Sequence, residues 1–154
     1  MAEEEKAQTE KPEAKEAAPA VKPAPAKKAA SGGKVAVIRI RNITQADGAI
    51  RDTIKMLRLH KKFTCAVYDK TPSMMGMLSK AKDYVTFGEV DEATVKMLQD
   101  KRGTKDKEGK MNNFFHLHPP TGGFERKGIK RNFVQGGALG YRADKIKALI
   151  EKMM

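Results

Sequence analysis

Three short apolar stretches of the chain have the two-residue period of β-strands, in which alternate side chains share one face. The first, residues 34–40, carries apolar side chains on both faces and places Arg39 and Arg41 at its exit. The second covers residues 63–69 and the third residues 84–89. The pattern predicts three strands, the first of which is buried for most of its length.

Helical periodicity occupies both gaps between these stretches. Ile50, Ile54 and Leu57 stand at positions i, i+4 and i+7 and form an amphipathic stripe. Thr71 and Pro72 supply an N-cap and a first helical residue for a second helix, whose methionines favour a gap-filling core role over a partner-binding groove. The order β-α-β-α-β predicts a two-layer α+β unit with its helices packed on the sheet.

The pattern beyond residue 90 predicts two more helices and a short strand. Asp91 can cap a helix that ends at Gly103, and the polar residues 104–113 predict an exposed loop. The apolar run 114–118 favours a strand that returns the chain to the body. A final helix with an apolar stripe is expected from Asp144. The stripe consists of Ile146, Leu149, Ile150 and Met153.

Composition divides the chain into three parts. Residues 1–33 contain ten alanines, four of the seven prolines, no aromatic residue, and equal numbers of lysine and glutamate. Such a segment cannot bury enough apolar surface to offset the entropy of ordering, so we expect a disordered low-complexity tail that acts as a spacer. We expect residues 34–90 to form the core domain, and residues 91–154 to supply a helix, a basic arm and a closing C-terminal helix.

The arm, residues 119–142, is the most basic and glycine-rich part of this region. Its basic residues are Arg126, Lys127, Lys130, Arg131 and Arg142. Its six glycines disfavour a helix, and its charge disfavours a core strand. Cationic heads, exposed N–H groups and aromatic rings suit structured RNA, while a solvated linker loop is the alternative. Phe133 and Tyr141 favour anchoring the arm over stacking on bases. Because a strand and a helix hold its ends, we interpret it as a tethered RNA-binding arm.

The net charge of +12 belongs entirely to residues 34–154, which carry 25 basic and 13 acidic residues. This excess favours a polyanionic partner, although charge alone does not separate RNA from DNA or an anionic membrane surface. Cys65 is the only cysteine, so no intramolecular disulfide can form, and its apolar surroundings predict a buried, reduced thiol. No apolar run approaches the roughly 20 residues that span a bilayer, and no signal-peptide pattern is present, so we expect a soluble, cytoplasmic protein.

The catalytic and metal-binding motifs that the chain approaches are all incomplete. Gly123 and Gly128 have the spacing of a phosphate-binding loop, but Ile129 stands where lysine must follow. His116 and His118 can share one face of a strand, yet no coherent set of further ligands accompanies them. No serine–histidine–carboxylate or cysteine–histidine arrangement can be argued. The sequence therefore predicts a protein that is not an enzyme and uses no cofactor or metal.

Five segments along the chain carry a family resemblance. They are VIRIRN, LRLHKKF, TPSMMGMLSKAKDYVTFGEVD, VDEATVKMLQDKRG and HLHPPTGGFERKGIKRNFVQGGALGYR. Over about residues 34–154 the chain resembles the large-ribosomal-subunit protein family numbered thirty in bacteria and archaea and seven in eukaryotes, and the last two segments resemble its archaeal and eukaryotic branch. Bacterial members stop after the third strand. The resemblance implies a β-α-β-α-β fold with a small antiparallel sheet, and a structural role in the large subunit of the cytoplasmic ribosome. The implied partners are ribosomal RNA and neighbouring ribosomal proteins.

The resemblance implies two zones of RNA contact, the first at the strand exit and the end of the first helix and the second in the arm. The contacts would be Arg39, Arg41 and Asn42 at the strand exit, Arg58, Lys61 and Lys62 at the end of the first helix, and the five basic residues of the arm. Cationic heads neutralise phosphates and release counterions, so we expect recognition of RNA shape and an affinity that falls with salt. A free-standing basic nucleic-acid-binding or RNA-processing module is the alternative.

Overall fold

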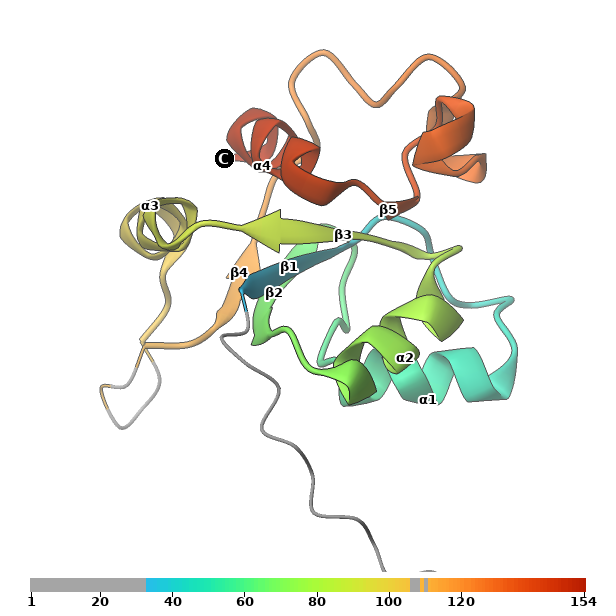
Figure 1. Ribbon diagram of the computed structural model, residues 1–154, viewed down its shortest axis with the longest axis horizontal. Helices are drawn as coiled ribbons and strands as arrows, with labels where there is room; N and C mark the ends of the chain where they lie inside the picture. Colours follow the sequence, from blue (N-terminus) through green and yellow to red (C-terminus); the bar gives the residue numbers. More distant parts are fainter. Residues whose placement is uncertain (1–32, 106–108, 110) are drawn as a thin grey trace, which may run out of the picture.

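The structure is a computed structural model that describes residues 33–105, 109 and 111–154. The predicted low-complexity tail lies outside the described residues except for Gly33, as does part of the predicted loop 104–113. The remainder is the α+β unit that the sequence predicts, with a mixed sheet and helices on both of its faces (Figure 1).

Within the described part of the chain, β1 (Lys34–Arg39) is the central strand of a five-stranded sheet with the order β4-β2-β1-β3-β5. It pairs antiparallel with β2 (Thr64–Asp69) on one side and β3 (Val85–Val90) on the other, which confirms the three predicted strands. The C-terminal extension adds β4 (Phe114–His116), antiparallel to β2, and β5 (Gly140–Tyr141), parallel to β3. Each outer edge of the three-stranded core is therefore paired with a short strand from the extension.

Two helices start at side-chain caps, and the second of these caps is the one predicted at Thr71. The carboxylate of Asp47 accepts a hydrogen bond of 2.9 Å from the N–H of the next residue at the start of α1 (Gly48–Met56). The hydroxyl of Thr71 accepts one of 3.2 Å from the N–H three residues further on, at the start of α2 (Pro72–Ala81). Such caps accept hydrogen bonds from N–H groups that have no partner inside the helix. Pro72 at the start of α2 has no N–H and therefore needs no acceptor.

The core between the sheet and helices α1 and α2 is built from side chains on the apolar faces of the strands and helices. Val35 and Val37 of β1 point to it with Phe87 of β3, and they pack with Ile54 and Leu78 of the two helices. All five side chains are at most 5% exposed. The predicted packing of helices on the sheet is confirmed.

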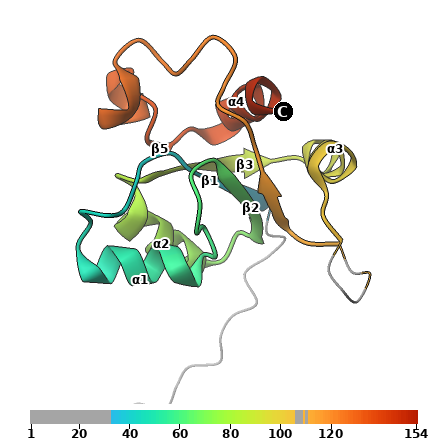
Figure 2. The same cartoon turned by 180° about the vertical axis from the view of Figure 1, so that it is seen from behind.

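The opposite face is covered by the C-terminal extension. There α3 (Glu92–Arg102) and α4 (Ile146–Met153) lie across the sheet from α1 and α2 (Figures 1 and 2). Ala36 and Ile38 of β1 and Cys65 of β2 pack with the four apolar residues predicted for the final helix, all of which are buried. Burial on both faces explains why residues 35–38 of β1 are all apolar rather than alternating with polar residues.

At Gly88 the C-terminal extension packs directly against β3. A Cβ at this position would lie 2.3 Å from the carbonyl oxygen of Ala143. Ala143 has a φ of 47° and begins the 3₁₀ turn Ala143–Lys145, which leads into α4. The final helix is predicted from Asp144, but its regular part begins two residues later because this turn folds tightly over β3.

Candidate nucleic-acid interface

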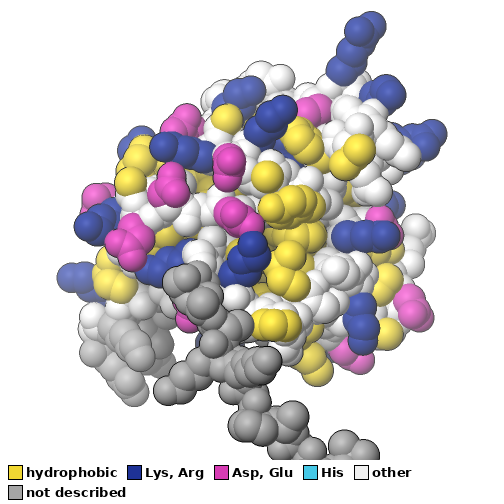
Figure 3. Space-filling model, viewed as in Figure 1, with side chains coloured by type: hydrophobic (Ala, Val, Ile, Leu, Met, Phe, Trp, Pro, Cys, Tyr) yellow, Lys and Arg dark blue, Asp and Glu magenta, His cyan; other side chains and the backbone are white. Residues whose placement is uncertain are grey.

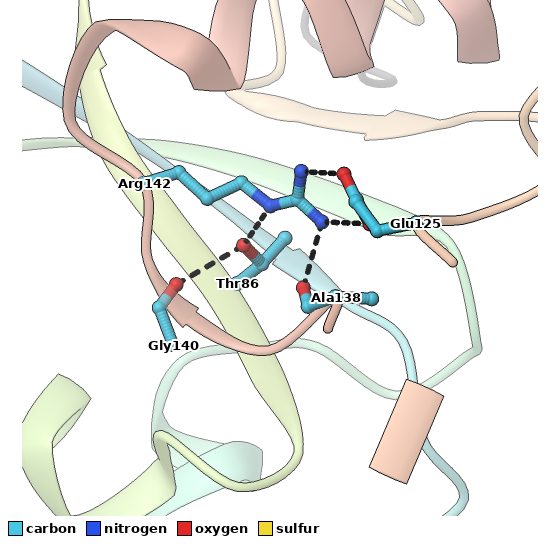
Figure 4. Close-up of polar contacts among 5 residues, drawn as sticks. All are labelled: Thr86, Glu125, Ala138, Gly140 and Arg142. Carbon is cyan, nitrogen blue, oxygen red and sulfur yellow. Dashed lines mark hydrogen bonds and ion pairs between the residues drawn. The ribbon is translucent and has the colours of Figure 1, made fainter. Parts of the chain in front are cut away.

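Arg142 fastens the base of the arm to the sheet. Its side chain is 2% exposed, and its guanidinium donates hydrogen bonds to both carboxylate oxygens of Glu125 (Figure 4). It also donates to the Thr86 hydroxyl of β3 and to the Ala138 carbonyl, at 2.9 Å each. The guanidinium carbon lies 4.6 Å from the ring centroid of Phe133. One side chain thus joins three separate parts of the arm to the central sheet.

Arg142 was predicted to contact RNA, and the structure places its side chain inside the body. Its donors are committed to internal acceptors, so it positions the arm instead of offering a charge to a phosphate. Burial alone raises the pKa of Glu125, but the hydrogen bonds and positive charge of Arg142 outweigh it and hold the pKa below its ordinary value. The pair is therefore ionised at neutral pH, and it contributes no net charge to the surface.

The other four cations of the arm face solvent. Arg126, Lys127, Lys130 and Arg131 are all exposed, and the space-filling view shows Lys and Arg side chains projecting where the arm lies, at the upper right (Figure 3). The backbone that carries them is ordered by two 3₁₀ turns and by internal hydrogen bonds. Those bonds include Ala138 N–H to Gly128 carbonyl at 3.1 Å and Leu139 N–H to Arg131 carbonyl at 3.2 Å.

The arm is packed onto the exit of β1. Ala138 and Leu139 are at most 1% exposed and form a small apolar cluster with Ile40, the residue that follows β1. Gly137 makes this packing possible, because a Cβ there would lie 2.1 Å from the carbonyl oxygen of Arg131. Two zones that the sequence separates by about a hundred residues therefore meet at one end of the sheet.

Arg39 has the same inward orientation as Arg142. It is 3% exposed and donates to the carbonyls of Leu59 and His60, at 2.9 and 2.6 Å, and to that of Arg41 at 3.1 Å. A weaker contact of 3.4 Å reaches the side-chain oxygen of Asn42. Arg39 was also predicted to contact RNA, and in the structure its guanidinium holds the loop that follows α1.

Arg41 and Asn42 remain at the surface. The Arg41 guanidinium carbon lies 5.2 Å from the ring centroid of Tyr84, and one of its nitrogens donates to the carbonyl of Asp83 at 3.3 Å. The Asn42 side-chain oxygen accepts a 3.0 Å hydrogen bond from the next N–H and fixes the turn. Together with Thr44 and Gln45, these residues line an open hollow of about 370 Å³ at the strand exit.

The loop after α1 presents the third group of predicted residues. Lys61 and Lys62 are exposed, and the loop ends at Phe63, whose ring stacks on that of Phe124 with centroids 6.3 Å apart. That contact links the loop to the beginning of the arm. Arg58 is also exposed, and its guanidinium carbon lies 5.6 Å from the ring centroid of Phe114 on β4.

Two cations that sequence reasoning missed lie beside the arm. Lys145 and Lys152 line a hollow between the arm and α4, and both are exposed. Their spacing of seven residues was an available signal, since positions i and i+7 share one helix face. They were overlooked because the apolar stripe of the same helix already accounts for its amphipathic pattern.

The described residues contain no group of three or more His, Cys, Asp or Glu side chains that could hold a metal ion. No helix in the described ranges is long and apolar enough to cross a membrane. The surface features that remain are the exposed cations of the arm, the strand exit and the loop after α1.

The protein thus has an α+β body and an ordered arm with exposed cations. These features are typical of small basic proteins that bind a polyanion by charge. The sequence profile of the family described as ribosomal protein L30p/L7e matches residues 35–85. The chain is 39% identical over 151 residues to large ribosomal subunit protein uL30 of Methanococcus vannielii, covering 77% of this chain and 98% of that protein.

Two further archaeal relatives bear the same name. The uL30 of Nanoarchaeum equitans is 40% identical over 147 residues, which is 75% of this chain and 95% of the relative. That of Methanopyrus kandleri is 39% identical over 139 residues, which is 68% of this chain and 93% of the relative. The chain belongs to the L30p/L7e family of ribosomal proteins, and the resemblance drawn from its motifs is confirmed.

Proposed function

We infer that the protein is a structural constituent of the large ribosomal subunit, where it binds ribosomal RNA and lies beside neighbouring ribosomal proteins. Its relatives carry the name of large-subunit proteins, and the family is not enzymatic. The observation that carries the role is the ordered arm, whose four exposed cations are held in place by the buried pair of Arg142 and Glu125.

We propose that the direct RNA contacts are the members of the predicted set that lie at the surface, of which Arg41 is half-buried and the others are exposed. These are Arg41, Asn42, Arg58, Lys61, Lys62, Arg126, Lys127, Lys130 and Arg131. Arg39 and Arg142 contribute indirectly: Arg39 fixes the loop after α1, and Arg142 fixes the arm. Ordering these segments before binding reduces the entropy that would otherwise be lost when RNA is bound.

The proposal predicts how steeply the affinity for RNA should fall with salt concentration. Each phosphate contact contributes about −0.7 to −0.9 to the slope of log affinity against log salt, so four arm cations contribute about −3. A fourfold increase in salt then weakens binding by about 60-fold through the arm alone. Loss of two contacts should reduce the steepness of the slope by about 2.

The test is the double charge reversal Lys130→Glu with Arg131→Glu. We expect weaker binding to large-subunit ribosomal RNA, a shallower salt dependence and an unchanged unfolding transition, because both side chains are exposed. The matched control is Lys96→Glu with Lys101→Glu, which makes the same change of net charge on the exposed side of α3.

Two outcomes contradict the proposal. If the α3 variant loses as much affinity as the arm variant, binding depends on net charge and the arm has no special role. If the wild-type protein binds duplex DNA as tightly as ribosomal RNA, it is a free-standing basic nucleic-acid-binding module instead.

A further inference from the structure

A hollow of about 290 Å³ lies between the beginning of the arm and α4. In Figures 1 and 2 the beginning of the arm rises beside α4. Pockets for small molecules start at roughly 300 Å³, so the hollow suits one flat group and excludes a docked helix. Its walls include Gly122, Phe124, Phe133, Lys145, Ala148, Leu149 and Lys152.

The walls of this hollow are fixed by contacts elsewhere in the body. Phe124 stacks on Phe63 with an interplanar angle of 25°, so its ring is held in one orientation. Phe133 is held under the guanidinium of Arg142, which is itself buried. Leu149 is 4% exposed and belongs to the core beneath α4. A preformed apolar surface of this kind loses little entropy when a flat ring binds to it.

The charge at the rim is positive. Arg142 and Glu125 neutralise each other inside the hollow, which leaves Lys145 and Lys152 as its remaining charges. Neither lysine forms an ion pair among the described residues. They stand seven residues apart, which is about 10 Å along a helix axis, and Ala148 lies between them on the same side.

Lys145 Nζ lies 5.7 Å from the ring centroid of Phe133, at the edge of the apolar floor. An apolar floor between two lysines that form no ion pair among the described residues matches the chemistry of a nucleotide. We propose that this hollow binds one unpaired nucleotide of RNA, with its base against Phe124, Phe133 and Leu149 and its flanking phosphates at Lys145 and Lys152. Unpaired bases are the parts of folded RNA that proteins reach with aromatic side chains, and stacking tolerates any base. An acidic peptide would satisfy the lysines but would leave the apolar floor uncovered. The inference rests on the proposed binding of ribosomal RNA and adds to it a specific subsite.

The decisive variant is Ala148→Phe, which fills the hollow and leaves every charge unchanged. Residue 148 is exposed on α4, so the fold should tolerate the larger side chain. Ala93→Phe makes the identical replacement at an exposed position of α3, away from the lining residues, and serves as the control. Thermal unfolding of both variants checks that each is folded.

Dissociation constants for large-subunit ribosomal RNA are measured at several salt concentrations, together with ultraviolet crosslinking and mass spectrometry. We expect Ala148→Phe to bind about tenfold more weakly with an unchanged salt slope, and to lose the crosslinks of Phe124 and its neighbours. Ala93→Phe should behave as wild type. Lys145→Ala with Lys152→Ala should make the salt slope shallower by about 2.

The inference is overturned if Ala148→Phe binds as tightly as wild type and keeps the same crosslinks. In that case a loss of affinity in the Lys130 and Arg131 double reversal still supports the proposed function. If the wild-type protein itself does not bind the ribosomal RNA, the proposed function fails and the subsite fails with it.

Discussion

Replacing Arg142 with alanine tests whether the buried clamp orders the arm. The change removes hydrogen bonds to Thr86, Ala138 and both oxygens of Glu125. Breaking a buried pair by removing one partner costs about 3–5 kcal/mol, because the other charge stays without compensation. The Glu125 side chain is 29% exposed and can be partly hydrated, so we expect the lower value, about 3 kcal/mol. For a folded body of this size the melting temperature should fall by about 10–15 °C.

Urea unfolding of wild type and variant gives the free energy directly. Arg126→Ala is the control, since it removes an exposed cation of the same arm and should change stability by less than about 0.5 kcal/mol. A double-mutant cycle with Glu125→Gln isolates the energy that the two side chains share. If Arg142→Ala unfolds within about 0.5 kcal/mol of wild type, the clamp is not what holds the arm.

The pair of Arg142 and Glu125 should also make the stability of the protein depend on pH. A carboxylate whose folded pKa lies below its unfolded value stabilises the protein above the unfolded pKa, and this stability is lost as pH falls through the folded pKa. Glu125 has such a lowered pKa because the hydrogen bonds of Arg142 outweigh the effect of burial. Wild type should therefore lose stability more steeply than Arg142→Ala below pH 4.5, the ordinary pKa of glutamate. Parallel curves for the two proteins would contradict this reasoning.

Two further predictions concern the core. Gly88→Ala should destabilise the protein by about 2 kcal/mol or more in urea unfolding, because a Cβ would meet the Ala143 carbonyl at 2.3 Å and a backbone atom cannot rotate away. The control is Gly76→Ala on α2, where a Cβ would meet no atom, so this variant should be neutral or stabilising in the same assay. Burial raises the pKa of the Cys65 thiol to about 12, so an aromatic disulfide reagent at pH 8 should leave it unmodified in the native protein and modify it fully in urea. Equal rates in both states would refute the burial.

The elements of the core domain could be predicted because their signals are local. The short apolar run within residues 34–40 predicts a strand buried on both faces, and Thr71 with Pro72 marks the start of α2 within two residues. Such patterns are set by neighbours along the chain, so no knowledge of distant contacts is needed. The final helix could be predicted for the same reason, although the turn at Ala143 depends on its contact with Gly88 and delays its start.

The orientation of Arg39 and Arg142 could not be predicted, because it depends on acceptors far away in the sequence. Arg142 bonds to Glu125, 17 residues earlier, and to Thr86, 56 residues earlier. Charge along a sequence shows how many cations exist, but it does not show which of them the fold turns inward. β5 escaped prediction for a related reason, since two residues are too few to display a period.

The placement of α4 over the second face of the sheet has a consequence for synthesis and for shorter relatives. Ala36, Ile38, Cys65 and Val67 are made early, yet the helix that buries them is among the last described parts of the chain to be translated. Until α4 is made, these apolar side chains are exposed and prone to aggregation, which favours late folding or protection by a chaperone. A family member that stops after its third strand therefore needs polar residues at these positions, or another protein or RNA to cover them.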